Sequence, residues 1–137
     1  MNHKRIYGLL SVTSFILLGL LLIEINAKNQ IMDNDFRLIE AQNRALSLQI
    51  NKMILNESWI DQEEKKKEIE RLVDIVYTSG YDGSGYAVKD KRYMDLFWNL
   101  NYYEEYGAAV SLILNKGGIE AADRDYLNKI DEDLKAR

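Results

Sequence analysis

The hydrophobic and polar positions divide the chain into one long apolar run and several amphipathic blocks. The run covers residues 6–23 and follows a short basic start. A helix of this length, at about 1.5 Å rise per residue, covers most of a hydrocarbon core about 30 Å thick. The pattern therefore predicts a transmembrane anchor over residues 6–25, preceded by a basic flank at residues 1–5.

Two alternatives compete with a retained anchor. The first is a cleaved signal peptide, because Ile25-Asn26-Ala27 loosely matches a small-residue cleavage site. Its apolar core would usually be about 7 to 15 residues long, shorter than this run, and no proline or glycine follows closely. The second is a buried core helix, which the scarcity of polar residues in the run disfavours. The retained anchor is the interpretation we prefer, and the other two stay open.

Basic residues on both sides of the run bear on its orientation. Lys4 and Arg5 precede it, and Lys28 and Arg37 follow it, so the two flanks are nearly balanced. The first pair is directly adjacent to the apolar segment, which favours an amino terminus in the cytoplasm. We therefore expect a single-pass cell-membrane protein with its C-terminal domain outside.

The block after the anchor, residues 26–60, carries apolar residues at alternating steps of four and three. This spacing predicts a stalk helix and is typical of a short coiled coil. The apolar positions are Met32, Phe36, Ile39, Leu46, Ile50, Met53 and Ile60, with Asn43 and Glu57 at the two remaining seam positions.

Three further helices are predicted in a distal domain at residues 61–137. Their expected ranges are residues 61–79, 89–115 and 119–135. Largely apolar residues recur in each at helical spacing, whereas the alternation typical of strands is confined to a short piece at residues 86–88. In the second of these helices the predicted stripe is Tyr93, Leu96, Leu100, Tyr103, Gly107, Val110 and Leu114, and in the third it is Ile119, Ala122, Tyr126, Ile130 and Leu134. The fold class is therefore all-α, with a transmembrane helix continuing into a stalk helix and then a small distal three-helix domain.

Glycine marks the expected ends of the distal helices, because the chain contains no proline. The glycine-rich segment at residues 79–85 is the strongest loop signal. A second signal lies at residues 115–118, where Gly117 is placed to adopt the positive φ that ends a helix.

The stalk pattern permits two arrangements. An Asn at a seam position can pair with its symmetry mate in a parallel dimer, which makes Ile39, Asn43, Leu46 and Ile50 candidate oligomerisation residues. The charges that flank the seam do not favour a parallel pair, however. The alternative is that the same stripe packs against the distal helices of its own chain.

Aromatic residues concentrate in the distal domain, where eight of nine tyrosines lie between residues 77 and 126. Trp98, Tyr102, Tyr103 and Tyr106 are candidate interaction residues, because Tyr and Trp bury large rigid surfaces and keep a polar tip. The same residues are also suited to a small core, and a ligand pocket is a third alternative.

Charge and residue types restrict the chemistry. After the apolar run at residues 6–23, 16 Lys and Arg stand against 22 Asp and Glu, a net charge of about −6, so we expect no nucleic-acid partner. The single histidine, His3, precedes the span, and there is no cysteine. We therefore predict no catalytic, cofactor-binding or metal-binding residue, and we expect that the protein is not an enzyme.

One segment, residues 92–119, suggests a relationship. It contains Leu100-Asn101-Tyr102-Tyr103-Glu104-Glu105-Tyr106, followed by Ala108-Ala109 and Gly117-Gly118-Ile119. This pattern resembles that of a group of single-span bacterial and prophage membrane proteins with a helical C-terminal domain. The group has no established activity, so the resemblance implies only a bacterial or phage origin.

Two functions follow as hypotheses. In the first, the acidic helical domain binds another membrane or envelope protein, to recruit or regulate it. In the second, the span and the stalk drive self-assembly into a homo-oligomer, and the distal domain only decorates it.

Overall fold

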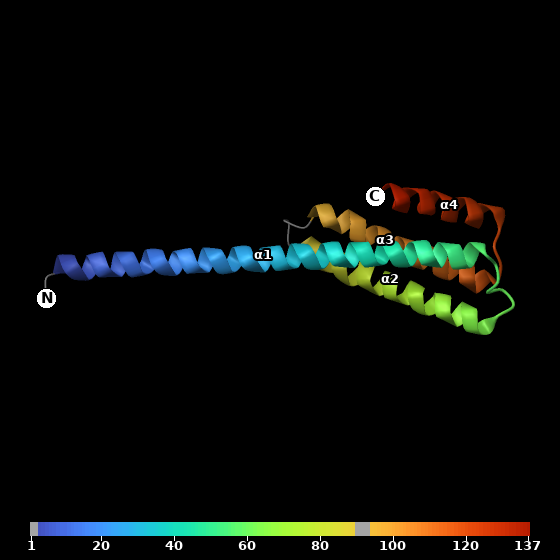
Figure 1. The fold of residues 1–137 in the computed structure, drawn as a ribbon, viewed down its shortest axis with the longest axis horizontal. Helices are drawn as coiled ribbons and strands as arrows, with labels where there is room; N and C mark the ends of the chain where they lie inside the picture. Colours follow the sequence, from blue (N-terminus) through green and yellow to red (C-terminus); the bar gives the residue numbers. More distant parts are fainter. Residues whose placement is uncertain (1–2, 90–93) are drawn as a thin grey trace. The chain divides into compact units, whose positions relative to one another are not determined.

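The computed structural model is helical throughout its four elements, within the residues it describes, 3–89 and 94–137. Side chains are described for residues 14–82 and 99–137. The helices, shown in Figure 1, are α1 (His3–Leu55), α2 (Glu63–Lys89), α3 (Met94–Lys116) and α4 (Ala121–Ala136). The all-α prediction is confirmed for this part of the chain.

The chain divides into two compact units, residues 1–37 and residues 38–137. In the first unit, the described part of α1 contains a stretch that is long and apolar enough to cross a membrane, and none of that stretch is buried. Length and composition thus agree with the predicted span.

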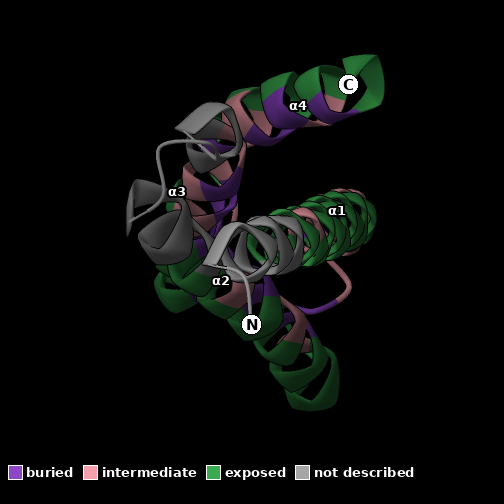
Figure 2. Ribbon diagram, turned by 90° about the vertical axis from the view of Figure 1, so that its left-hand side faces the viewer, coloured by how far each residue is buried: buried purple, intermediate pink, exposed green. Residues whose placement is uncertain are grey.

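In the second unit, α2, α3 and α4 lie alongside residues 38–55 of α1, and the helices alternate in direction (Figure 1). This up-and-down order follows from the short connections, which favour antiparallel neighbours. Figure 2 shows buried residues on the side of α4 that faces α1 and α3. The shared core contains Ile50, Ile54, Trp59, Ile69, Val73, Val76, Tyr103, Tyr106, Val110, Ile113, Leu114, Leu127, Ile130 and Leu134.

Residues 38–55 of α1 belong to this second unit. The sequence prediction assigned them to a stalk separate from a distal domain that starts at residue 61. Ile50 and Ile54 are fully buried, and they add apolar side chains to a core that α2, α3 and α4 alone would leave small. The folded domain is therefore built from four helical segments.

The predicted loop at residues 79–85 is wrong, because α2 continues through it to Lys89. The extended piece expected at residues 86–88 is wrong for the same reason. Gly80 instead lies at a close helix contact: a Cβ there would lie 2.7 Å from the Glu104 backbone nitrogen. The glycine therefore allows α3 to approach and does not end α2.

Gly107 on α3 has the reciprocal role. A Cβ at this position would lie 2.8 Å from Tyr77 Cβ and 3.1 Å from Tyr77 Cα on α2. Both helices thus place a glycine where the other backbone approaches. The crossing at Gly80 and Gly107 lets the backbones of α2 and α3 pack closely.

Among the remaining helix ends, α2 begins at Glu63 and α3 ends at Lys116, within two residues of the predictions. The stalk prediction is too long, because α1 ends at Leu55 and not at residue 60, and α3 begins at Met94, five residues after its predicted start.

Gly117 has φ of 74° and follows the last residue of α3, as expected. In α4 the buried residues are Asp123, Leu127, Ile130 and Leu134. The stripe predicted through Ala122 and Tyr126 is therefore displaced by one residue in the first half of the helix.

Candidate interaction surface

The structure places two of the predicted interaction tyrosines in the core. Tyr103 is 0% exposed and Tyr106 is 1% exposed, whereas Tyr102 is half-buried. The Tyr102 and Tyr103 rings meet edge to face with centroids 5.5 Å apart. Tyr103 and Tyr106 consequently offer no side-chain surface to a partner in this fold. The side chain of Trp98 lies outside the described residues.

Burial also governs the acidity of these phenols. Loss of solvation raises the pKa of both Tyr102 and Tyr103 to about 12. The nearby Glu40 carboxylate adds to the effect at Tyr103. Burial raises the pKa of Tyr106 well above its ordinary value of 10.0. The three phenols therefore remain neutral in the folded domain at ordinary pH.

The predicted oligomerisation residues lie within the domain of their own chain. Asn43 and Ile50 are buried, and Ile39 and Leu46 are half-buried. The Ser79 hydroxyl on α2 donates a 2.7 Å hydrogen bond to Asn43 Oδ1. This placement favours the alternative in which the stripe packs on its own helices, and self-association through it stays a prediction.

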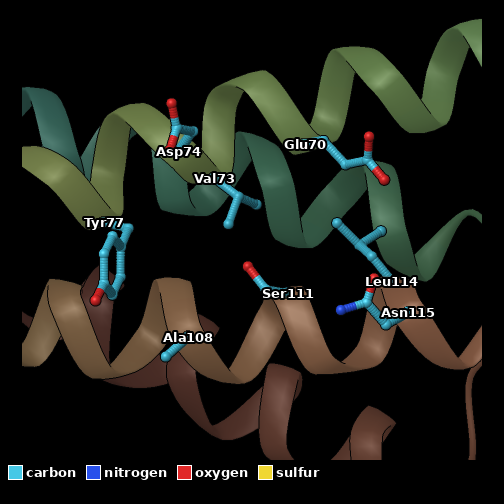
Figure 3. Close-up of a pocket in the computed structure, with 8 residues that line it drawn as sticks. All are labelled: Glu70, Val73, Asp74, Tyr77, Ala108, Ser111, Leu114 and Asn115. Atoms are coloured by element: carbon cyan, nitrogen blue, oxygen red, sulfur yellow. The ribbon is translucent and has the colours of Figure 1, made fainter.

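A groove of about 470 Å³ lies between α2 and α3, next to the crossing at Gly80 and Gly107. Figure 3 shows α2 and α3 contributing its opposite walls. The lining residues are Glu70, Val73, Asp74 and Tyr77 on α2, and Ala108, Ser111, Leu114 and Asn115 on α3. Val73 and Leu114 are buried and form the floor, and the other six are exposed to solvent.

Large apolar side chains extend this surface. Tyr77 is 38% exposed and stacks on Tyr81, which is 58% exposed, with ring centroids 6.4 Å apart. Leu112, 65% exposed, follows Ala108 by one helical turn on the same face of α3. Contiguous exposed apolar side chains are typical of binding surfaces. We call the groove and these three residues the α2–α3 surface.

Carboxylates dominate the charge of the α2–α3 surface. Glu70 and Asp74 lie one turn apart on α2 and are both exposed. Lys66 approaches Glu70 only to 4.0 Å, and such exposed pairs contribute little. No cation lies among the described residues that line the groove. The surface is therefore acidic along one wall.

The acidic side chains of the described residues are not gathered into a metal site. No group of three His, Cys, Asp or Glu side chains capable of holding a metal ion occurs among residues 14–82 and 99–137. The geometry supports contact with another macromolecule through the α2–α3 surface.

Comparison with known proteins adds no relative. No family model matches the chain, and no curated protein or solved structure matches it. The resemblance to bacterial and prophage proteins stays an expectation.

The sequence prediction missed Tyr77, Tyr81 and Leu112. One signal was present: the buried stripe of α2 runs through Ile69, Val73, Val76 and Gly80, and Tyr77 and Tyr81 follow four residues apart beside it. Extending the helical period past Gly80 places both tyrosines on one exposed side.

Proposed function

We propose that the chain is a single-pass membrane protein whose acidic helical domain binds another membrane or envelope protein. The α2–α3 surface is the observation that carries this proposal. It combines exposed aromatic and aliphatic side chains with a groove of about 470 Å³. Such a surface is costly in water and is retained where a partner covers it.

The apolar segment of α1 supports the membrane part of the proposal. Phe15, Leu17 and Ile23 are each more than half exposed, and they lie on different sides of the helix. A helix that is apolar all round is stable only when buried in protein or in lipid. Lipid satisfies this requirement for a stretch of this length.

The orientation that we propose keeps the amino terminus in the cytoplasm and the domain outside. Lys4 and Arg5, directly beside the apolar run, are its support. A reporter that is active only outside the cytoplasm, fused to Arg137, tests this orientation. Activity of the fusion is expected, and activity only of a cytoplasmic reporter would reverse the assignment.

Photo-crosslinking in native membranes tests the binding function. A photoreactive amino acid is placed at Tyr81 or Leu112 on the α2–α3 surface, and at exposed Asn128 on α4 as the control. We expect an adduct with a different protein from the first two positions and little from the third. Equal adducts from all three, or none, would contradict the proposal.

The same experiment separates the second hypothesis, self-assembly, from the first. An adduct with the mass of two copies of this chain would support a homo-oligomer. Asn43, the seam residue of that hypothesis, accepts a hydrogen bond from Ser79 of its own chain. This bond favours the first hypothesis. Binding of a different protein is therefore the function that we put forward.

A further inference from the structure

The α2–α3 groove originates at the glycine crossing. At Gly107 the two backbones approach so closely that a Cβ would lie 3.1 Å from Tyr77 Cα. The groove is lined by residues that follow this point on α3 and precede it on α2. The helices therefore diverge from the crossing and leave a channel, about two turns long, between residues 70–77 and 108–115.

The shape of this channel suits a third helix. Its floor is apolar, with Val73 and Leu114 beneath flanking polar walls. In Figure 3, Val73 and Ser111 point toward the space between the two helices. An amphipathic helix can place its apolar stripe in such a groove. Addition of a peptide as a β-strand would need a free strand edge, and none occurs among the described residues.

The charges determine which kind of helix fits. Glu70 and Asp74 face the groove from one wall, and no ion pair is formed by Asp74 within the described residues. Basic side chains on a partner would meet these carboxylates, while acidic ones would be repelled. The aliphatic stem of Lys or Arg would also cover the exposed Tyr77 ring.

We infer that the α2–α3 groove is the docking site for a basic amphipathic helix of a partner protein. The inference rests on the proposed function and adds the partner's chemistry to it. The apolar stripe of the partner lies over Val73 and Leu114, and its Lys or Arg residues pair with Glu70 and Asp74. The tyrosine pair Tyr77 and Tyr81 extends the contact beyond the crossing.

Model peptides test this directly. The full chain is placed in nanodiscs of zwitterionic phosphatidylcholine, so that the lipid does not attract basic peptides. Three fluorescent helical peptides of about 18 residues share a leucine stripe and carry Lys, Gln or Glu beside it. Fluorescence anisotropy measures each Kd at low and at high salt, with empty nanodiscs as the blank.

The Lys peptide is expected to bind about tenfold more tightly than the Glu peptide, with the Gln peptide between them, and this preference should shrink at high salt. Equal affinities, or absence of binding by the Lys peptide, would overturn the inference. A preference that persists unchanged at high salt would also contradict it.

Charge reversal identifies the groove. The double variant Glu70→Lys and Asp74→Lys should weaken binding of the Lys peptide by about tenfold or more. The double variant Asp125→Lys and Glu132→Lys changes net charge equally at exposed positions of α4, and should weaken it by about threefold or less. Equal losses in the two variants would show that only net charge matters and would refute the site.

Failure of the basic-helix inference can be distinguished from failure of the proposed binding function. If position 112 crosslinks to another protein while the three peptides bind alike, the binding function stands and the basic-helix inference fails. If position 112 links only to a second copy of this chain, the groove has a different occupant and both proposals fail.

Discussion

The Tyr106 hydroxyl on α3 donates a hydrogen bond of 2.8 Å to Asn51 Oδ1 on α1. The Asn51 amide nitrogen in turn donates to the Leu127 carbonyl oxygen on α4 over 3.2 Å. Asn51 is fully buried and Tyr106 is 1% exposed. One amide thus joins three helices in the core, where a polar group is tolerated only with its partners in place.

Replacing Tyr106 with Phe should lower the free energy of unfolding by about 1 to 3 kcal/mol. The change removes the only hydroxyl that reaches Asn51 Oδ1 among the described residues, and leaves that oxygen buried without a donor. Chemical denaturation of the full chain in nanodiscs, followed by circular dichroism and tryptophan fluorescence, measures the difference.

Tyr103→Phe is the matched control. The Tyr103 hydroxyl is buried and makes no hydrogen bond within the described residues, so its removal eliminates an unsatisfied polar atom. Its stability should be unchanged or slightly higher. Equal destabilisation by the two variants would show that loss of any buried hydroxyl in this core, and not loss of the bond to Asn51, determines the effect.

Gly80→Ala and Gly107→Ala should each destabilise the domain by about 1 to 3 kcal/mol. The new methyl group would collide with backbone of the neighbouring helix, and backbone moves less easily than a side-chain end. Gly118→Ala is the control, because a Cβ at that position meets nothing within 4 Å. Thermal unfolding of the three variants gives the comparison. A stability gain at Gly80 would show that the helix there has room for a methyl group and that α3 does not approach it closely.

Alkaline pH should destabilise the domain through its tyrosines. Folding raises the pKa of Tyr103 from 10.0 to about 12, so the neutral phenol is favoured in the folded state. The stabilisation that the neutral Tyr103 phenol gives the folded state is fully present below about pH 10 and is lost as the pH rises toward 12. For Tyr103 the loss approaches about 1 kcal/mol per pH unit in that window.

The wild type and Tyr103→Phe are therefore compared by denaturation across this range. The variant should lose stability less steeply, because it lacks one phenol that the unfolded chain ionises first. Parallel pH profiles would rule out Tyr103 as a source of the alkaline sensitivity.

Acid should weaken the start of α4. Asp123 accepts a 3.0 Å hydrogen bond from the Glu120 backbone nitrogen and another from Lys116. These contacts hold the pKa of Asp123 below its ordinary value of 3.8, the backbone bond contributing most. The stabilisation is present above about pH 3.8 and is lost as the pH falls through the lower, folded-state pKa.

Asp123→Asn should consequently flatten the acid part of the stability profile, measured by thermal unfolding at a series of pH values. Asp125→Asn, an exposed position on the same helix, is the control and should leave the profile unchanged. If both variants behave alike, the capping contact of Asp123 does not explain the acid response.

Sequence periodicity was sufficient for the parts of the fold that depend on one helix alone. The apolar run, the helical class and the positive φ of Gly117 each follow from local chemistry. The buried residues Leu100, Tyr103, Val110 and Leu114 of α3 also match the predicted stripe.

Features that depend on two helices were not accessible in this way. Gly80 looks the same in sequence whether it forms a loop or receives a neighbouring backbone, and only the position of α3 decides. Similarly, Tyr106 and Tyr81 are indistinguishable by composition. Tyr106 is buried against α1 and Tyr81 faces solvent, because of where the helices pack. The α2–α3 surface therefore emerged only from the three-dimensional arrangement.

The central claim, that a partner covers the α2–α3 surface, can be measured with single cysteines, because the chain contains none. Leu112→Cys and, as control, Asn128→Cys are labelled with a membrane-impermeant maleimide in native membranes and after purification. We predict slow labelling at position 112 in native membranes, fast labelling there after purification, and no such difference at position 128. Equal labelling rates at position 112 in both preparations would contradict the account.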